Sequence, residues 1–126
     1  MSNDTTNKSF SRHLENNREL FIKTGVRYEK LDLTNLLFVQ TEGKYIALHF
    51  KDGKRLLRVS LVNFLKESSH LNLIRIHKGF AINTDYINSY TSQEVTVLDN
   101  EIPIGRSYKG NWVNYLNKTN KKNLGR

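Results

Sequence analysis

Two clusters of basic side chains are the parts of this chain that could carry out chemistry. Arg75, His77 and Lys78 stand beside a glycine between apolar, strand-like runs, and residues 106–109 form a second cluster, Arg-Ser-Tyr-Lys. Both clusters fall where the period-two pattern breaks, so loops or element ends should carry them. Binding residues concentrate on loops that a rigid sheet holds in place. The clusters therefore predict a surface that binds an anion.

The overall charge agrees with an anionic partner. Lys and Arg number 20 against 12 Asp and Glu, so the 126 residues have a formal net charge of +8. Such an excess favours DNA, RNA or an anionic surface, and the first partner to test is a polyanion. A merely basic protein without such a partner remains the alternative.

The second cluster begins a predicted helix. Ser107 can act as its N-cap, and the start of a helix offers free N–H groups with a partial positive charge. A phosphate fits there, between the charges of Arg106 and Lys109 and the hydroxyls of Ser107 and Tyr108. The alternative is that Ser107 is a plain cap with solvated basic neighbours. The apolar face expected for this helix consists of Trp112, Val113 and Leu116.

Enzyme chemistry has little support in the sequence. The absence of cysteine excludes disulfides, thiolate zinc sites and thiol nucleophiles. No histidine pair has a metal-ligand spacing, and residues 42–44 lack the glycine-rich run of a P-loop. We therefore expect no enzyme, no metal and no cofactor. His49 should be a solvent-side or hydrogen-bonded strand residue, whereas His77 could contact phosphate or form a hydrogen bond within its own loop.

Length and hydropathy predict one soluble domain. A chain of 126 residues has room for a single core. The apolar runs are far shorter than the ~20 residues of a membrane-spanning helix, and no signal-peptide core is visible. We expect a cytoplasmic protein without a membrane partner.

The apolar pattern is mainly β, interrupted by a short helix after Ser60 and by the final helix. Gly25, Asp52-Gly53 and Asp99-Asn100 are turn signals. Alternating residues predict strands at 20–23, 27–31, 36–41, 45–50, 55–59, 73–76, 80–82, 86–90, 94–98 and 101–104. The predicted domain covers residues 19–117. Residues 1–18 should form a flexible polar arm, in which residues 12–20 could add a short helix, and residues 118–126 a disordered basic tail.

The order and spacing of several blocks resemble the LytTR family of bacterial DNA-binding domains. The resemblance covers roughly residues 20–117 and is carried by residues 38–45 (FVQTEGKY), 58–61 (RVSL), 74–83 (IRIHKGFAIN), Ile87 and 102–106 (IPIGR). It implies a mainly β fold of stacked small antiparallel sheets with short helices. It also implies a sequence-specific transcription regulator that binds double-stranded DNA through loops.

The resemblance also implies which residues contact DNA. Lys44 and Tyr45 occupy a first loop, His77 and Lys78 a middle loop, and Arg106, Ser107 and Lys109 a last one. The outer loops would enter successive major grooves, while the middle loop would face the backbone and minor groove between them. Repeated half-sites, with two copies of the chain on DNA, are the arrangement expected.

The chain departs from the family at three points. Gly79 replaces a frequent serine, which removes one hydroxyl contact to phosphate. Gly105-Arg106-Ser107 replaces the usual Ser-Arg-Arg, which favours Arg106 over Ser107 for base reading. Family regulators usually carry a receiver domain of on the order of 100 residues before this domain. Only about 19 residues precede the first strand here, so we expect a stand-alone domain or an output fragment.

Two other functions compete with this interpretation. An RNA- or single-strand-binding β module would need exposed aromatics as stacking platforms, and five dispersed tyrosines are candidates (Tyr28, Tyr45, Tyr86, Tyr90 and Tyr108). An interaction module could instead present the basic face to an acidic protein.

Overall fold

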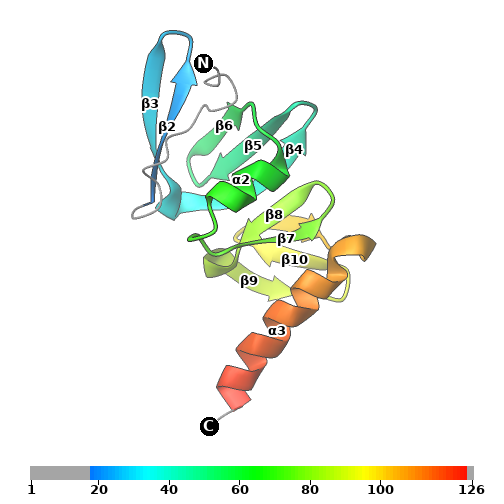
Figure 1. Ribbon diagram of the computed structural model, residues 1–126. Helices are drawn as coiled ribbons and strands as arrows, with labels where there is room; N and C mark the ends of the chain where they lie inside the picture. Colours follow the sequence, from blue (N-terminus) through cyan, green and yellow to red (C-terminus); the bar gives the residue numbers. More distant parts are fainter. Residues whose placement is uncertain (1–17, 125–126) are drawn as a thin grey trace.

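A five-stranded antiparallel sheet forms the centre of the protein (Figure 1). The computed structural model describes residues 18–124, so residues 1–17 of the predicted arm at 1–18 lie outside this range. The strand order in the central sheet is β6-β5-β4-β8-β7. Its strands are β4 (Leu36–Glu42), β5 (Tyr45–Phe50), β6 (Gly53–Leu57), β7 (Leu73–His77) and β8 (Phe80–Asn83).

A hairpin and a short helix cover one face of the central sheet. The hairpin consists of β2 (Glu19–Thr24) and β3 (Arg27–Asp32), and the helix is α2 (Leu61–Glu67). The helix begins after Ser60, as predicted. Ser60 is its N-cap, because its hydroxyl accepts a hydrogen bond from the Asn63 N–H at 3.0 Å. The first apolar core lies between these elements and the sheet, and it includes Leu20, Leu36, Val39, Ile46, Leu48, Leu57 and Phe64.

A three-stranded sheet and the last helix cover the other face. This sheet has the order β11-β10-β9, with β9 (Ile87–Tyr90), β10 (Glu94–Val97) and β11 (Asn100–Pro103). Helix α3 (Lys109–Leu124) packs against β7. The second core contains Leu37, Phe38, Ile76, Ile82, Val95, Val97, Ile102 and Trp112. Because both faces of β4 are covered, residues 36–39 are all buried despite the alternation of a strand.

Short 3-10 helices connect the layers. They are η2 (Leu33–Asn35), η3 (Thr84–Tyr86) and η4 (Arg106–Tyr108). The Asp32 carboxylate accepts a hydrogen bond from the Thr34 N–H at 2.9 Å, and this bond lowers the pKa of Asp32. The buried Asn83 caps η3 and donates through Nδ2 to the Leu36 carbonyl at 2.8 Å. Asn83 therefore fixes where β8 ends against the start of β4.

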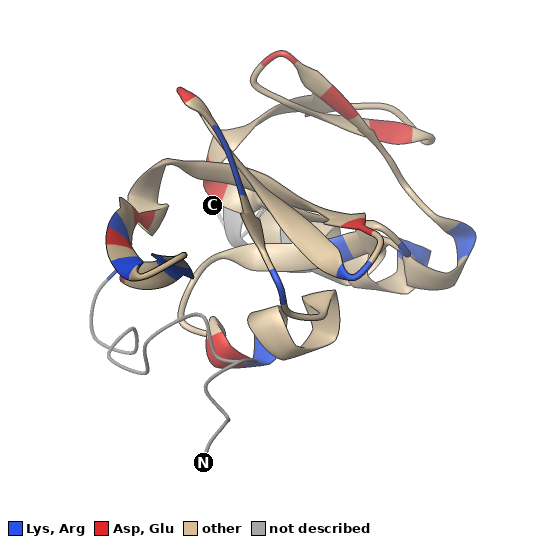
Figure 2. Ribbon diagram, turned by 90° about the horizontal axis from the view of Figure 1, so that it is seen from above, with Lys and Arg blue, Asp and Glu red and all other residues tan. Residues whose placement is uncertain are grey.

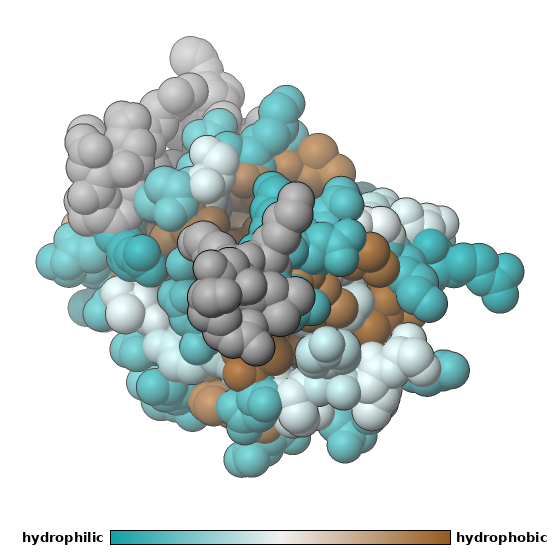
Figure 3. Space-filling view, turned by 90° about the horizontal axis from the view of Figure 1, so that it is seen from below, coloured by the Kyte–Doolittle hydropathy of each residue, from teal (hydrophilic) through white to brown (hydrophobic). Residues whose placement is uncertain are grey.

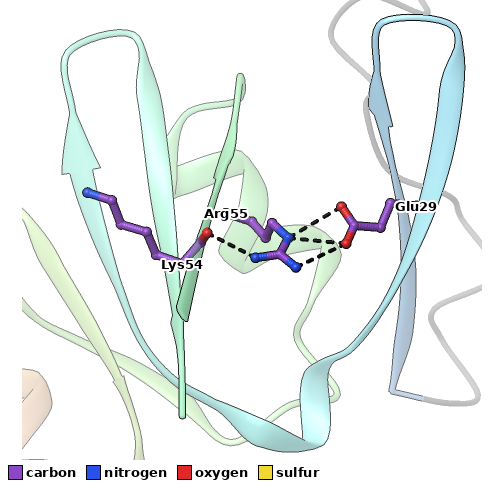
Figure 4. A network of polar contacts seen from close by, with 3 residues as sticks. All are labelled: Glu29, Lys54 and Arg55. Atoms are coloured by element: carbon purple, nitrogen blue, oxygen red, sulfur yellow. Dashed lines mark hydrogen bonds and ion pairs between the residues drawn. The ribbon is translucent and has the colours of Figure 1, made fainter. Parts of the chain in front are cut away.

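One exposed ion pair joins the hairpin to the edge of the central sheet. Arg55 on β6 donates from Nε and Nη2 to the carboxylate of Glu29 on β3, at 3.1–3.3 Å (Figure 4). The pair raises the pKa of Arg55. Because both side chains remain exposed, its contribution to stability should not exceed about 1 kcal/mol.

The predicted mainly β fold of small antiparallel sheets is confirmed, and so are its hairpins at Gly25 and Asp52-Gly53. Some details were wrong. The last hairpin turns at Leu98 and Asp99, where Leu98 has a φ of 54°. Tyr86, predicted as the start of a strand, is instead the last residue of η3.

The predicted end of the last helix was also wrong. Residues 118–124 continue α3 instead of forming a disordered tail. Val113 is exposed, and the packed face consists of Trp112, Tyr115 and Leu116. The helix extends past the β9–β11 sheet toward the end of the chain (Figure 1), and polar side chains surround small apolar areas when the protein is viewed from below (Figure 3). Within residues 18–124, neither helix has the length and apolar character that a membrane span needs.

Candidate nucleic-acid interface

The first predicted loop is a tight turn at the end of the central sheet. Glu42 pairs with Tyr45, so Gly43 and Lys44 are the only two residues of the connection. Gly43 has a φ of 62°, which a side chain would disfavour, and this backbone places Lys44 at the exposed tip. The ring of Tyr45 is also exposed, and the Arg58 guanidinium lies 5.8 Å from its centroid.

The middle loop is a second tight turn, between β7 and β8. His77 pairs with Phe80, and a bulge lies between Arg75 and His77. The Gly79 N–H donates to Nδ1 of His77 at 2.9 Å, and the imidazole packs edge-on against the Phe80 ring. Of the two roles expected for His77, the structure shows the hydrogen bond within its own loop. Since Nδ1 accepts, a neutral His77 has its proton on Nε2, where it can donate to a ligand.

Backbone hydrogen bonds hold the three predicted loops side by side. Thr41, before the first turn, donates through its N–H to the Gly79 carbonyl at 2.9 Å. Gly105, before the last segment, donates to the Ile76 carbonyl at 2.7 Å. The middle loop thus lies between the other two, and all three lie along one side of the protein (Figure 1).

Close packing explains both glycine departures from the family pattern. A Cβ on Gly79 would lie 3.1 Å from the Thr41 hydroxyl, and a Cβ on Gly105 would lie 3.1 Å from Cα of His77. Either contact is tighter than most Cβ contacts in proteins, so a residue with a side chain would require its neighbour to shift by a few tenths of an ångström. In this chain the space of the missing Gly79 side chain is occupied by Thr41.

The last segment combines η4 with the start of α3. Gly105, not Ser107, is the N-cap of η4, and no side chain caps it. Ser107 is exposed within η4, so the predicted capping role was wrong. Arg106 and Lys109 are exposed as well, and the first turn of α3 contains no acidic residue. Cations are unfavourable at a helix N-terminus, so an anionic partner would offset this cost.

A comparison of the amino-acid sequence with known protein families identifies the family of this chain. Residues 26–117 match the LytTR family model, the LytTr DNA-binding domain. The chain belongs to the LytTR family of DNA-binding domains. A solved structure of similar fold is the LytTr DNA-binding domain of a protein described as a methyl-accepting/DNA response regulator from Bacillus cereus. That domain is 16% identical, with a TM-score of 0.65, and the alignment covers 79% of this chain and 96% of the other. At this identity the likeness shows the fold alone. No curated protein matches the chain.

Arg75 organises two of the three loops of this LytTR domain, a role that the sequence did not predict. Its Nε donates to the His77 carbonyl at 3.3 Å, and its Nη2 makes a short bond to the Lys78 carbonyl. The same guanidinium lies over the ring of Tyr108, and Asn111 on α3 donates to the Arg75 carbonyl at 3.0 Å. The place of Arg75 in the basic cluster was visible in the sequence, but its contacts with the two carbonyls and the ring were not.

The cations on the loops have no carboxylate partners among residues 18–124. Among the residues that the structure describes, the ion pairs use Lys30, Lys54 and Arg55. Lys44, Lys78, Arg106 and Lys109 are exposed and form no ion pair with any described residue. Figure 2 marks the basic and acidic positions along the ribbon. An arrangement of unpaired cations on one side attracts a polyanion.

A row of rings runs from the middle loop across the sheet. His77 contacts Phe80, Phe80 lies near Phe38, and Phe38 stacks on His49 with ring centroids 4.2 Å apart. His49 also contacts the Gln40 side chain at 3.1 Å, which agrees with the expected hydrogen-bonded strand histidine. Burial, and then the charge of Lys54, lower the pKa of His49, while Glu42 opposes them. His49 is therefore part of the support for the loops and not of their exposed surface.

The described residues contain no cluster of three or more histidines and acidic residues that could hold a metal ion. The chemistry available at the loops consists of cationic groups, hydroxyls and ring N–H groups. These groups donate hydrogen bonds to phosphates and to the edges of bases.

Proposed function

We propose that this LytTR domain binds double-stranded DNA in a sequence-specific manner and regulates transcription. The observation that carries the proposal is the alignment of three loops, held by the bonds from Thr41 to Gly79 and from Gly105 to Ile76. These loops present Lys44, Lys78 and Arg106 without acidic partners among the described residues. A row of loops suits a duplex, whose backbone and grooves repeat along one direction.

The loop residues receive two kinds of role in this proposal. Lys44 with Tyr45, and Arg106 with Ser107, contact base edges in two major-groove segments. His77, Lys78 and Lys109 contact the phosphate backbone. Arg106 is the stronger candidate for base recognition, since an arginine forms two parallel hydrogen bonds with the edge of guanine.

Repeated half-sites occupied by two copies of the chain complete the proposal. One set of three short loops reads only a few base pairs, so a second copy would supply the remaining sequence discrimination. The prediction is therefore a second binding event on sites that contain two half-sites. Sedimentation of the protein with one-half-site and two-half-site duplexes measures the stoichiometry.

Single-stranded nucleic acid is a less suitable partner. The exposed Tyr28, Tyr45 and Tyr90 lie on three different sheets. Stacking of successive bases needs rings that are close together along one path. An acidic protein would use the same cations but would show no preference among duplex sequences.

One experiment tests the proposal against both alternatives. Duplexes are selected from a random pool, and the selected duplex then competes with scrambled duplex, single-stranded RNA and an acidic protein at one salt concentration. We expect the selected duplex to bind most tightly. With ~5 neutralised phosphates, the slope of log K against log salt should be about −4 to −5. Equal binding of selected and scrambled duplexes would contradict sequence-specific recognition.

A further inference from the structure

A groove beside the first loop has the properties of a phosphate site. It has a volume of about 520 Å³ and runs between the Gly43–Lys44 turn and the residues that lead into α2. Lys44, Arg58 and Arg75 line it, and none of the described residues in its lining is acidic. Three positive side chains therefore face one concave space.

The walls of the groove strengthen the effect of these charges. Ile46 and Leu61 line it and are buried, so part of the wall is apolar protein rather than water. Clefts with charges of one sign and walls of low dielectric constant concentrate the electrostatic field inside them. An anion in this groove is attracted more strongly than one beside a lysine on an open surface.

Arg58 is positioned to be the main contact. It follows β6, and its guanidinium lies 5.8 Å from the centroid of the Tyr45 ring, which limits its motion. No described carboxylate forms an ion pair with it. A planar guanidinium can offer two parallel N–H groups to the oxygens of a phosphate. Arg75 is committed to two backbone carbonyls, so it contributes mainly its charge.

The rim suits a phosphate that carries an organic group. Tyr45 and Val62 line the groove and are exposed, so apolar surface lies next to the cations. The volume falls within the range of about 300–1,000 Å³ that small-molecule sites occupy. We propose that the groove between the Gly43–Lys44 turn and Val59–Val62 binds a phosphate ester, with Arg58 as its principal ligand.

Two sources can supply this phosphate ester. One is the DNA backbone beside the first loop, and in that case the inference rests on the proposed function and adds Arg58 to the interface. The other is a free nucleotide that occupies the groove without DNA. A pair of matched variants separates the sources: Arg58→Gln removes the proposed ligand, and Lys66→Gln removes one positive charge from the last turn of α2, outside the groove.

The first measurement is the salt dependence of duplex binding. If the backbone supplies the phosphate, Arg58→Gln should reduce the slope of log K against log salt by about 1. Lys66→Gln should keep the slope of the unmodified protein. Thermal unfolding of both variants checks that the fold is retained, as expected for exposed side chains.

The second measurement is titration of the protein with a nucleoside 5′-monophosphate in the absence of DNA, followed by amide NMR shifts at Gly43 and Val59. Saturable shifts that disappear in Arg58→Gln, but not in Lys66→Gln, would assign the groove to a free ligand. If Arg58→Gln matches Lys66→Gln in both measurements, the phosphate site is overturned. Equal binding of all duplexes would contradict the proposed sequence specificity but not the phosphate site. The salt slope and the nucleotide titration would still show whether Arg58 binds a phosphate.

Discussion

The guanidinium carbon of Arg75 lies 4.7 Å from the ring centroid of Tyr108. Arg75 lies within β7, two residues before the strand ends at the middle loop, whereas Tyr108 belongs to η4 in the last segment. The same guanidinium donates to the carbonyls of His77 and Lys78. One side chain therefore fixes the distance between the loop that carries Lys78 and the loop that carries Arg106.

We expect Arg75→Lys to reduce sequence selectivity more than affinity. A lysine keeps the charge, but it lacks the planar fork that bonds two carbonyls and covers the Tyr108 ring. The loops would then sample several spacings, and contacts with bases would suffer more than contacts with phosphates. The measurement is the ratio of dissociation constants for selected and scrambled duplexes.

Arg27→Lys is the matched control, because Arg27 is exposed at the β2–β3 turn. It should leave that ratio unchanged. An unchanged ratio in Arg75→Lys as well would mean that Arg75 does not position the loops.

Lys44 and Lys78 should differ in the kind of binding that they support. Lys78→Ala should weaken all duplexes alike and reduce the salt slope by about 1, since we assign it a phosphate contact. Lys44→Ala should also change the preferred half-site. Both side chains are exposed, so the free energy of unfolding should move by no more than about 0.5 kcal/mol. Binding isotherms at several salt concentrations, with urea unfolding in parallel, check both statements.

The double variant provides the internal control. If the two lysines touch separate parts of the duplex, their losses in binding free energy should add. Full affinity and full selectivity in both single variants would show that the DNA-facing side has been assigned wrongly.

Most of the fold could be predicted from the sequence because its signals are local. Period-two runs and glycine turns mark the hairpins, and Ser60 with Leu61 and Phe64 marks α2. The errors lie where tertiary contacts decide. Val113 has a spacing compatible with the packed face of α3, but Trp112 and Tyr115 pack into the second core instead and Val113 is exposed. Nothing local indicates that α3 continues past residue 117 through a polar stretch.

The candidate site was predicted only in part, for the same reason. Exposed cations such as Lys44 and Arg106 could be placed on loops from the sequence pattern. The contacts of Arg75 depend on the carbonyls of the middle loop and on the ring of Tyr108. The bulge in β7 and the position of η4 bring these groups together. The ring of Phe80 is half-buried and lies between His77 and Phe38, an arrangement that also depends on tertiary packing.

Arg106→Ala should relax the preference for one base pair. Arg106 is exposed at the start of η4, and the preceding Gly105 donates a backbone hydrogen bond to Ile76, which holds the backbone of this segment in place. If it reads a guanine, the loss of discrimination at that position should be about 1–3 kcal/mol. Binding to a series of single-base-pair variants of the selected duplex measures this loss.

Lys109→Ala serves as the comparison for Arg106. Lys109 is also exposed and cationic, but we assign it to the backbone, so it should weaken every duplex in the series equally. A uniform loss in Arg106→Ala as well would make Arg106 a phosphate contact.

His49 should make the stability of the domain depend on pH between neutral and mildly acidic conditions. Burial and Lys54 lower its pKa below the ordinary 6.5, so the unfolded chain binds a proton more readily than the folded one. The stabilising effect is complete above about pH 6.5 and is lost as the pH falls through the folded-state pKa. The free energy of unfolding in urea should therefore be lower at pH 5.5 than at pH 7.5.

His49→Gln isolates this effect, because the other histidines are present in both proteins. The variant should lose stability at pH 7.5, since it removes the stack on Phe38, but it should show a smaller change between the two pH values. Asp32 does not interfere, because its pKa lies below 3.8 and its effect is confined to more acidic solutions. If the variant and the unmodified protein change equally between pH 7.5 and 5.5, the His49 ring is not held in its neutral form by the packing between Phe38, Gln40 and Lys54.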